Sequence, residues 1–362
     1  MRLLHFSSAM TWRGGEQQII YLQEELVKYG IEQWIFCPVD SALAKFCLQR
    51  AIPFFTYRKR FAVNPLVAVQ LKKYCQRLAI DLVHIHDAHS HTFSYISALL
   101  GNKCPFVLSR RVDFPVRKNY FSHLKYNHPS IKKILCVSHY VEKILAPSIL
   151  DKHKIAVVHS GIDLSRLLNN KSSSLRAEYN IPEYIKVIAN IAAIASHKDY
   201  FTFVDTAEIL LNMREDILFF IVGADGGDRE EIIAYINEKN LDSNIVLTGF
   251  RSDIPQILSA IDIFLFTSKE EGLGTSIIDA FASGIPVVAT EAGGIPEIVQ
   301  NGRNGLLAPI GDAQALAHAV HKVLSDSQLV KQIVVNAKHT AMSFSKQLTA
   351  QKTYNLYKEI LQ

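Results

Sequence analysis

The segment that most constrains the fold runs from residue 261 to 294 and reads IDIFLFTSKEEGLGTSIIDAFASGIPVVATEAGG. Its apolar run at 261–266 is too short for a membrane helix and predicts a buried strand. A glycine-bearing loop follows, then a helix opened by Thr275 and Ser276, both good N-cap types, and then a second apolar strand at 286–290. This order of elements predicts a parallel α/β sheet.

The loop and the start of the helix at Thr275 form a candidate anion site. Free backbone N–H groups and the positive end of the helix dipole attract phosphate. Glu271 precedes the helix, and Asp279 lies one turn inside it on the face of Thr275. A site that holds phosphate and offers carboxylates to hydroxyls suits a nucleotide sugar. The alternative is an ordinary strand–helix–strand unit in which both carboxylates are solvated.

Length and composition are those of a two-domain protein. The chain has 362 residues, of which 49% are hydrophobic, and this is enough for two α/β domains. No apolar run approaches the roughly 20 residues of a membrane span. The start, MRLLHFSSAMTWRGG, has too short an apolar core for a signal peptide and predicts a first strand. The five cysteines show no paired spacing, which predicts reduced thiols in a cytoplasmic protein.

Charge is distributed unevenly along the chain. Residues 1–163 hold 22 of the 39 lysines and arginines but 11 of the 34 acidic residues, so the first half is basic and the remainder acidic. Basic clusters in the first half lie at 58–60, 72–73, 110–111, 117–118 and 132–133. Such a surface attracts anionic lipid headgroups or phosphorylated acceptors, so we expect peripheral association with an anionic membrane through this half. Solvated side chains are the alternative, and no nucleic-acid motif is present.

Short apolar strands alternate with amphipathic helices in both halves. In the first half we expect strands at 2–6, 33–37, 53–57, 81–86, 105–109, 133–138 and 154–159, and helices at 16–28 and 65–78. A polar linker at 169–174 follows. In the second half we expect strands at 186–191, 218–222, 244–248, 262–267, 286–290 and 305–308, and helices at 200–211, 228–239, 253–260 and 345–361. The alternation predicts two doubly wound parallel sheets with ligands at the carboxyl ends of their strands.

Motifs along nearly the whole chain resemble those of the GT-B glycosyltransferases of family 4, retaining enzymes that use nucleotide-sugar donors. In order, they are Gly14-Gly15, DLVHIHDAHSH at 81–91, VSHYV at 137–141, VVHSGID at 157–163, Lys198, IVGADGGDR at 221–229, LTGFRSDI at 247–254, KEEGLGTSIID at 269–279 and SGIPVVATEAGGIPEIV at 283–299. Each motif is weak alone, but their shared order and spacing make the resemblance specific.

The resemblance implies two Rossmann-like domains that face a central cleft. An acceptor-binding domain is expected at 1–165 and a donor-binding domain at 166–344, with the final helix, 345–362, packed back on the first domain. Closure of the domains about the linker would then assemble the site.

Within the second domain the resemblance implies the donor contacts. Lys198 matches a basic residue that pairs with the donor phosphates. Glu271 matches the first acid of an E-x7-E signature, which contacts hydroxyls of the transferred sugar. The remaining expected donor contacts are the cradle of Gly272, Leu273, Gly274, Thr275 and Ser276, the second acid Asp279, Gly223, and Arg251 near the nucleotide base.

In the first domain, Gly14 and Gly15 match a glycine pair that lets phosphate approach the backbone; a tight turn before a helix is the alternative. His86 matches a cleft histidine near the donor sugar and is expected to act in catalysis with Lys198 and Glu271. Arg110, Arg111 and Asp113 lie in the run RRVDFPV, which resembles a subgroup associated with lipopolysaccharide core. Guanidinium groups there suit an anionic acceptor.

Three positions depart from the family pattern. Asp279 is one methylene shorter than the usual glutamate. Ala193 stands where an arginine is usual, which removes one phosphate partner that Arg251 or Arg111 would have to replace. Many members also place a histidine after the fifth strand, where this chain has Ser109-Arg110-Arg111.

These features predict a retaining glycosyltransferase that moves a sugar from a nucleotide-diphosphate sugar to an anionic cell-envelope glycan or glycolipid of lipopolysaccharide type. We expect it in the cytoplasm, at the inner face of the cytoplasmic membrane. No cofactor is expected, and no metal, since Lys198 and the helix dipole would supply the positive charge. The spacing of His84, His86, His89 and His91 also fits no standard zinc site.

Two other functions remain open. Ala193 and Asp279 favour a catalytically silent nucleotide-sugar-binding protein, and the same architecture also serves nucleotide-sugar epimerases. An NAD dehydrogenase is disfavoured because no G-x-G-x-x-G turn follows the first strand.

Overall fold

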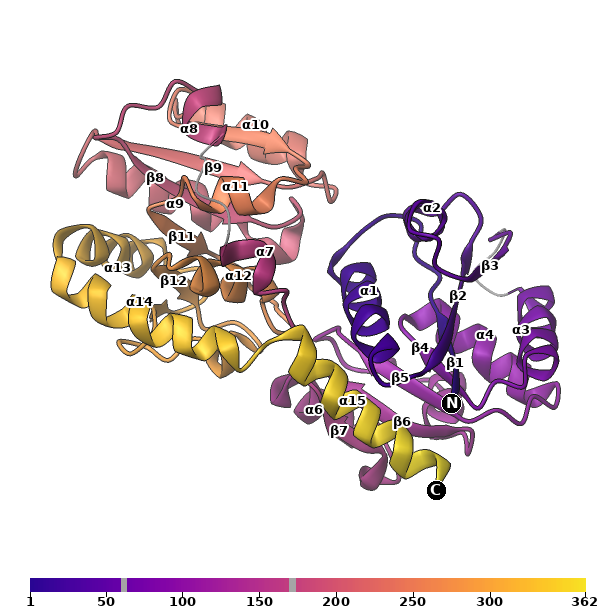
Figure 1. Ribbon diagram of the computed structural model, residues 1–362. Coiled ribbons are helices and arrows are strands. Elements are labelled where there is room, and N and C mark those ends of the chain that lie inside the picture. The colour runs from indigo at the N-terminus through magenta and orange to yellow at the C-terminus, as the bar shows by residue number, and fades with distance from the viewer. Residues whose placement is uncertain (60–63, 169–173) are drawn as a thin grey trace. The chain divides into compact units, whose positions relative to one another are not determined.

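The computed structural model describes residues 1–59, 64–168 and 174–362 and divides into two compact units (Figure 1). Unit 1 comprises Met1–Gly161 and Lys346–Gln362, and unit 2 comprises Ile162–Ser345. The chain therefore leaves unit 1 after Gly161 and returns to it at Lys346. The expected linker at 169–174 lies outside the described residues except for its last member.

Unit 1 is built on a parallel sheet of seven strands in the order β3-β2-β1-β4-β5-β6-β7. The strands are β1 Arg2–Phe6, β2 Glu32–Pro38, β3 Phe54–Tyr57, β4 Leu82–Ile85, β5 Phe106–Arg110, β6 Ile131–Cys136 and β7 Ile155–Val157. The order reverses between the neighbouring strands β1 and β4, so the loops after them diverge and leave room for a ligand at their carboxyl ends.

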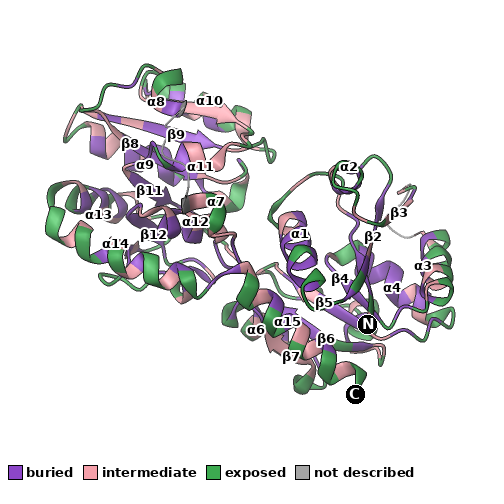
Figure 2. Ribbon diagram, viewed as in Figure 1, coloured by how far each residue is buried: buried purple, intermediate pink, exposed green. Residues whose placement is uncertain are grey.

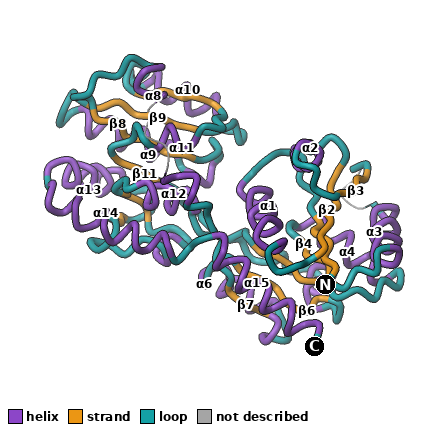
Figure 3. Tube along the Cα trace, in the orientation of Figure 1, coloured by secondary structure: helices purple, strands orange, loops and turns teal. Residues whose placement is uncertain are grey.

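The helices of unit 1 cover both faces of this sheet (Figure 3). They are α1 Gly14–Val27, α2 Ala42–Gln49, α3 Pro65–Arg77, α4 Ala88–Leu99, α5 Tyr120–Asn127, α6 His139–Leu145 and α15 Lys346–Leu361. Helix α15 packs against α1 and β6. Its buried residues Ala350 and Tyr357 join Leu3, Leu82 and Val107 in one core cluster, so the last helix is part of the core of unit 1.

Unit 2 has the same architecture, with a parallel sheet of six strands in the order β10-β9-β8-β11-β12-β13. The strands are β8 Lys186–Ile191, β9 Ile217–Val222, β10 Ile245–Gly249, β11 Ile263–Phe266, β12 Val287–Thr290 and β13 Leu306–Ala308. The helices are α7 Ser165–Leu168, α8 Ser174–Glu178, α9 Tyr200–Leu211, α10 Arg229–Glu238, α11 Ile254–Leu258, α12 Thr275–Ser283, α13 Ala313–Ser325 and α14 Ser327–Met342.

Apolar side chains from both faces of the sheet fill the core of unit 2, and the strands β11 and β12 are buried throughout (Figure 2). Phe203, Phe219 and Leu265 are fully buried in one cluster with residues of α13. The sequence prediction of two doubly wound parallel sheets is confirmed. Within the described residues, no helix combines the length and apolar character needed to cross a bilayer.

Candidate functional site

The order of the sheet in unit 2 reverses between β8 and β11, and the loops after these strands bring Lys198 and Glu271 together. The Nζ of Lys198 donates a hydrogen bond to Oε2 of Glu271, and the two side chains are only 13% and 15% exposed. The same Nζ lies 5.0 Å from the ring centroid of Phe266, at a distance that permits a cation–π interaction. Burial strengthens this ion pair relative to one in water.

The helix that follows Glu271 begins without a capping side chain. Its N-cap residue is Gly274, whose φ of +90° is in the left-handed region that favours glycine. The expected capping by Thr275 or Ser276 is wrong, because Gly274 ends the loop one residue earlier and Thr275 is the first helical residue. The N–H groups of the first turn therefore have no capping acceptor from the N-cap side chain and can bind an anion. Gly272 and Leu273 are buried beside them.

Gly293 lies against the backbone of Glu271, a role that was not predicted from the sequence. The N–H of Gly294 donates to the carbonyl of Glu271 at 2.9 Å. Gly293 has a φ of +54°, and a Cβ there would lie 2.0 Å from that carbonyl oxygen. Only glycine fits such a close approach of two backbones. The pair Gly293-Gly294 after β12 was the sequence signal for this contact.

Asp279 lies half-buried on α12, eight residues beyond Glu271. Burial raises the pKa of its carboxyl to about 7, and the positive charge of Arg166 opposes this shift. Helix α7, which carries Arg166, packs against α12. Asp279 therefore changes its charge close to neutral pH, unlike an ordinary aspartate.

Gly223 and Arg251 lie at the ends of neighbouring strands of unit 2. A Cβ on Gly223 would lie 1.9 Å from the carbonyl oxygen of Ala192, so close strand packing requires a glycine there. Arg251 is held by two carboxylates, with ion pairs of 2.7 Å to Asp253 and 2.8 Å to Glu178. A guanidinium held in this way would have to leave both carboxylates to replace the arginine absent at Ala193.

In unit 1 the carboxyl ends of β1 and β4 carry three buried histidines, His5, His84 and His86. His5 lies opposite His84 in the sheet register, and the ring centroid of His86 lies 4.1 Å from that of His84 and 5.3 Å from that of His5. Burial lowers the pKa of His5 to about 4 and lowers the pKa of His84 and His86 well below their ordinary value. All three rings are therefore neutral at pH 7.

The three histidines place ligand atoms within 4.8 Å of one another, a spacing that a metal ion could bridge. Each ring nitrogen, however, already has a protein partner: Gln33 and His86 for His5, Ser109 and Tyr357 for His84, and His5 and Arg111 for His86. The positive charge of Arg111 also lies against His86. The arrangement thus suits a hydrogen-bonded cluster better than a cation site.

The other histidines of this stretch lie apart from the cluster. His89 is exposed in the first turn of α4, and His91 is buried against the ring of Tyr126. Neither His5 nor Tyr357 was expected from the sequence. The place of His5 inside the apolar run of β1 was a usable signal, whereas nothing in the sequence indicated the contact with Tyr357.

Arg111 follows β5 and contacts His86 twice, through the carbonyl oxygen at 3.3 Å and Nδ1 at 3.4 Å. Burial lowers the pKa of Arg111 to about 10, while the charges of Glu16 and Asp87 oppose the shift. Asp87 caps α4 by accepting from the N–H groups of His89 and Ser90. Arg111 thus stays charged at pH 7 among partly buried polar groups.

Arg110 points to a different place from its neighbour. Its side chain is buried and donates to the hydroxyl of Tyr126 at 2.8 Å and to the carbonyl of Phe114. The Arg110 side chain therefore ties the 111–119 loop to α5. Asp113 is half-buried in that loop.

Gly14 and Gly15 are the first two residues of α1. Gly14 is exposed and Gly15 half-buried, and a Cβ at either position would meet no atom within 4 Å. Packing therefore does not explain the glycine pair, and the space beside it is open to a ligand.

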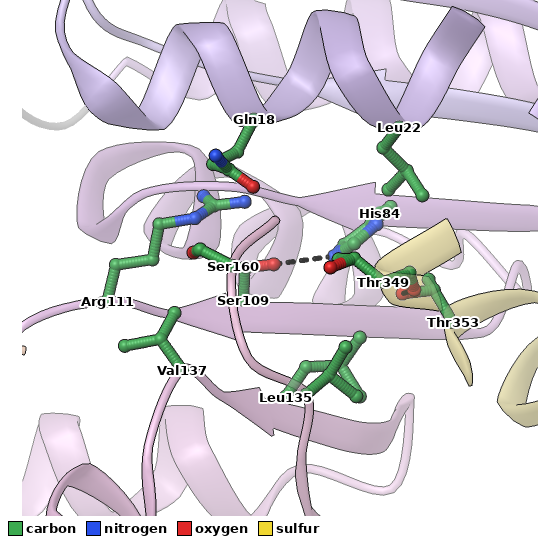
Figure 4. Close-up of a pocket in the computed structure, with 11 residues that line it drawn as sticks. Gln18, Leu22, His84, Ser109, Arg111, Leu135, Val137, Ser160, Thr349 and Thr353 are labelled. Atoms are coloured by element: carbon green, nitrogen blue, oxygen red, sulfur yellow. Dashed lines mark hydrogen bonds between the residues drawn. The ribbon is translucent and has the colours of Figure 1, made fainter. Parts of the chain in front are cut away.

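A small cavity of about 30 Å³, lined by both polar and apolar side chains, lies between α1, α15 and the strand ends of unit 1. Figure 4 shows Gln18 and Leu22 of α1 on one side, with Arg111, His84 and Ser109 facing them. The amide of Gln18 is fixed by two hydrogen bonds to Gly161, of 2.7 and 3.0 Å. The volume suits one water molecule rather than a substrate.

Two family models match the chain in succession. The model described as Glycosyltransferase Family 4 matches residues 12–166, and the model described as Glycosyl transferases group 1 matches residues 171–340. The first match covers most of unit 1 and the second most of unit 2.

Individual relatives agree with these matches. A glycosyltransferase from Rickettsia africae ESF-5 has the same fold, with a TM-score of 0.88 at 24% identity over 100% of this chain and 98% of that one. The lipopolysaccharide core biosynthesis glycosyltransferase LpsE of Rhizobium meliloti is 26% identical over 64% of each chain. The UDP-Gal:alpha-D-GlcNAc-diphosphoundecaprenol alpha-1,3-galactosyltransferase of Escherichia coli is 26% identical over 72% of this chain and 70% of its own.

Proposed function

The chain belongs to the group 1 and family 4 glycosyltransferases, retaining enzymes of the GT-B fold that use nucleotide-sugar donors, and from this premise we propose that it glycosylates an anionic acceptor of the cell envelope. Unit 2 would hold the nucleotide-diphosphate sugar, and unit 1 would hold the acceptor.

The observation that carries the donor assignment is the buried Lys198–Glu271 pair beside the uncapped start of α12. When the bond between sugar and diphosphate breaks, negative charge accumulates on the leaving diphosphate. Lys198 and the first N–H groups of α12 would stabilise that charge. Glu271 would accept hydrogen bonds from hydroxyls of the sugar.

The neighbouring residues complete the proposed donor site. The backbone of Gly272, Leu273 and Gly274, continued by Thr275 and Ser276, would cradle the diphosphate. Asp279 would accept hydrogen bonds from the ribose, and Gly223 and Arg251 would lie near the nucleotide base. This assignment requires no metal ion, because Lys198 and the helix dipole supply the positive charge.

The acceptor side of the proposal rests on Arg111, supported by Arg110 and Asp113 in the same loop. A guanidinium binds phosphate or carboxylate through two parallel hydrogen bonds. By name, one of the relatives described above is a glycosyltransferase of lipopolysaccharide core biosynthesis, and another is a galactosyltransferase for a diphosphoundecaprenol-linked sugar. An acceptor that carries phosphate fits both the charge of Arg111 and the open space beside Gly14 and Gly15.

We further propose that unit 1 binds the cytoplasmic face of an anionic membrane. Helix α5 exposes Tyr120 and Phe121 close to the basic pair Arg117 and Lys118, and exposed aromatic and basic side chains together suit a lipid interface. Of the cluster at 58–60, Arg58 is exposed, Lys59 donates to the carbonyl of Ser8 at 2.7 Å, and Arg60 lies outside the described residues. Sedimentation with phosphatidylglycerol vesicles, at low and high salt, tests this proposal.

Thermal shift with UDP, GDP, ADP and CMP and their sugar conjugates tests the donor site. A ligand at about 100 times its dissociation constant adds about 2.7 kcal/mol of stability. We expect a shift with one nucleotide family, lost in Lys198→Ala but kept in Lys239→Ala, whose lysine pairs with Glu208 away from the site. A shift that survives Lys198→Ala would contradict the assignment. No shift with any nucleotide would instead favour a silent protein, with Ala193 as the first residue to examine.

A further inference from the structure

The hydrogen bonds that lead to His86 have one consistent direction. Gln33 donates through Nε2 to the carbonyl of Gln23 at 3.0 Å, so its Oε1 is the atom that faces His5. That oxygen lies 3.0 Å from Nε2 of His5, and it can only accept, so His5 carries its proton on Nε2. A neutral imidazole has one N–H, which leaves Nδ1 of His5 as an acceptor.

The hydrogen bond between His5 and His86 fixes the tautomer of His86 as well. Its Nε2 lies 3.1 Å from Nδ1 of His5 and must donate to it, so Nδ1 of His86 is unprotonated. On the other side of the ring, Arg111 approaches this Nδ1 at 3.4 Å. A guanidinium can only donate, so it too requires an unprotonated Nδ1. The two ends of this chain of hydrogen bonds are the Gln23 carbonyl and the Arg111 guanidinium. Both therefore require the same tautomer of His86.

We propose that His86 is a positioning residue that acts through Arg111, and that Gln33 and His5 hold His86 in the tautomer that accepts from Arg111. The family resemblance implies a contact between His86 and the sugar, yet both ring nitrogens are already engaged with protein groups. The proposal rests on the proposed function to the extent that Arg111 is taken to bind the anionic acceptor.

A histidine suits this position because its ring is uncharged. A protonated ring against Arg111 would repel the guanidinium, and burial instead keeps His5, His84 and His86 neutral. The arrangement fixes the direction of Arg111 without cancelling its charge, which remains available to an anionic group of the substrate.

Nitrogen-15 NMR of the histidine side chains in the full chain tests the tautomers without any substrate. We expect wild-type His5 and His86 each to carry the proton on Nε2. Gln33→Leu removes the acceptor from Nε2 of His5 and should populate the other tautomer. Tyr357→Phe, which removes a partner of His84 only, is the matched control. A wild-type His86 protonated on Nδ1, or a Gln33→Leu pattern unchanged from wild type, would overturn the proposal.

Two substitutions of His86 separate its ring nitrogens in kinetics. In His86→Asn, a side-chain oxygen can replace Nδ1 and accept from Arg111, whereas His86→Gln reaches only the place of Nε2. We expect acceptor KM to rise about tenfold more in His86→Gln than in His86→Asn, with donor KM unchanged in both. The reverse order would contradict positioning through Arg111. If wild type transfers no sugar at all, the proposed function fails, and the NMR pattern still decides the tautomer.

Discussion

Each unit presents a cation at the point where the order of its sheet reverses, but the two cations are supported differently. In unit 2, Lys198 is paired with the carboxylate of Glu271. In unit 1, Arg111 contacts the carbonyl and ring of His86, which is neutral. A phosphate that binds Lys198 must compete with Glu271, whereas the contacts of Arg111 leave its charge intact.

This difference suits different demands on the two groups. The partner of a leaving diphosphate has to respond as charge develops during the reaction, and a flexible ammonium does this well. A group that only orients an acceptor gains more from a fixed direction, which a planar guanidinium held by neutral hydrogen-bond partners provides. The comparison therefore predicts that changes in unit 2 affect kcat, and that changes in unit 1 affect the acceptor KM.

The largest effect is expected from Lys198→Met, which keeps the length of the side chain but removes its charge. Loss of one stabilising contact to the leaving group lowers kcat by about 10² to 10³. Lys198→Met alone leaves the Glu271 carboxylate buried without its partner. Adding Glu271→Gln removes that charge, so the double variant should regain stability but not the rate. Steady-state kinetics and urea unfolding of the single and double variants measure both. A double variant with wild-type kcat would show that the charge of Lys198 is dispensable.

The next effect tests the backbone packing that holds Glu271 in unit 2, where unit 1 instead holds Arg111 by a side-chain network. Gly293→Ala would place a Cβ 2.0 Å from the carbonyl oxygen of Glu271. We therefore expect the free energy of unfolding to fall by about 3 kcal/mol or more, and nucleotide binding to weaken. Gly302→Ala is the control, since its φ of +74° is also left-handed but no atom lies within 4 Å; it should cost only about 1 kcal/mol. Thermal unfolding measures both losses of stability. Equal losses would mean that the left-handed backbone conformation, and not the close approach to Glu271, makes glycine necessary at position 293.

Much of the fold could be predicted because its signals are local. Apolar runs located every strand to within two residues, and the loops that carry Lys198 and Glu271 follow directly from the strand–loop–helix pattern. Gly274 shows the limit of this approach: the helix begins at Thr275 as predicted, but its N-cap is the left-handed Gly274 and neither Thr275 nor Ser276.

The histidine cluster could not be predicted in the same way. His5 and His86 are 81 residues apart, and Tyr357 and His84 are 273 apart. Their contacts depend on the register of β1 against β4 and on the return of α15 to unit 1, which no local pattern specifies. The direction of a hydrogen-bond chain depends further on side-chain atoms, and so on the folded structure.

Burial disfavours the charged form of a group in either unit: it lowers the pKa of the histidines in unit 1 and raises that of the Asp279 carboxyl in unit 2 to about 7. At pH values between 3.8, the ordinary pKa of an aspartate, and about 7, Asp279 holds a proton in the folded chain that it has released in the unfolded chain. Stability therefore falls as pH rises through this window, and the cost persists above it.

Asp279→Asn should consequently raise the free energy of unfolding at pH 8 by about 1 to 3 kcal/mol and change it little at pH 4. Urea unfolding at both pH values measures the difference. Asp216→Asn, at a carboxyl whose pKa is lowered by Arg214, should give no such gain at pH 8. A gain at pH 4 as large as that at pH 8 would show that the carboxyl is not strained by its burial.

The smallest effect concerns whether the side-chain network of unit 1 also stabilises the fold. The hydroxyl of Tyr357 lies 2.5 Å from Nδ1 of His84, whose Nε2 lies 2.8 Å from Ser109. Tyr357→Phe leaves a buried ring nitrogen without its partner and should cost about 1 to 2 kcal/mol in urea unfolding. Tyr354→Phe, on the same helix with its ring stacked on Tyr29, should cost less than about 0.5 kcal/mol. Similar costs for both would mean that α15 is held by apolar packing alone, and that the neutral network of unit 1 serves to orient Arg111 and adds nothing to stability.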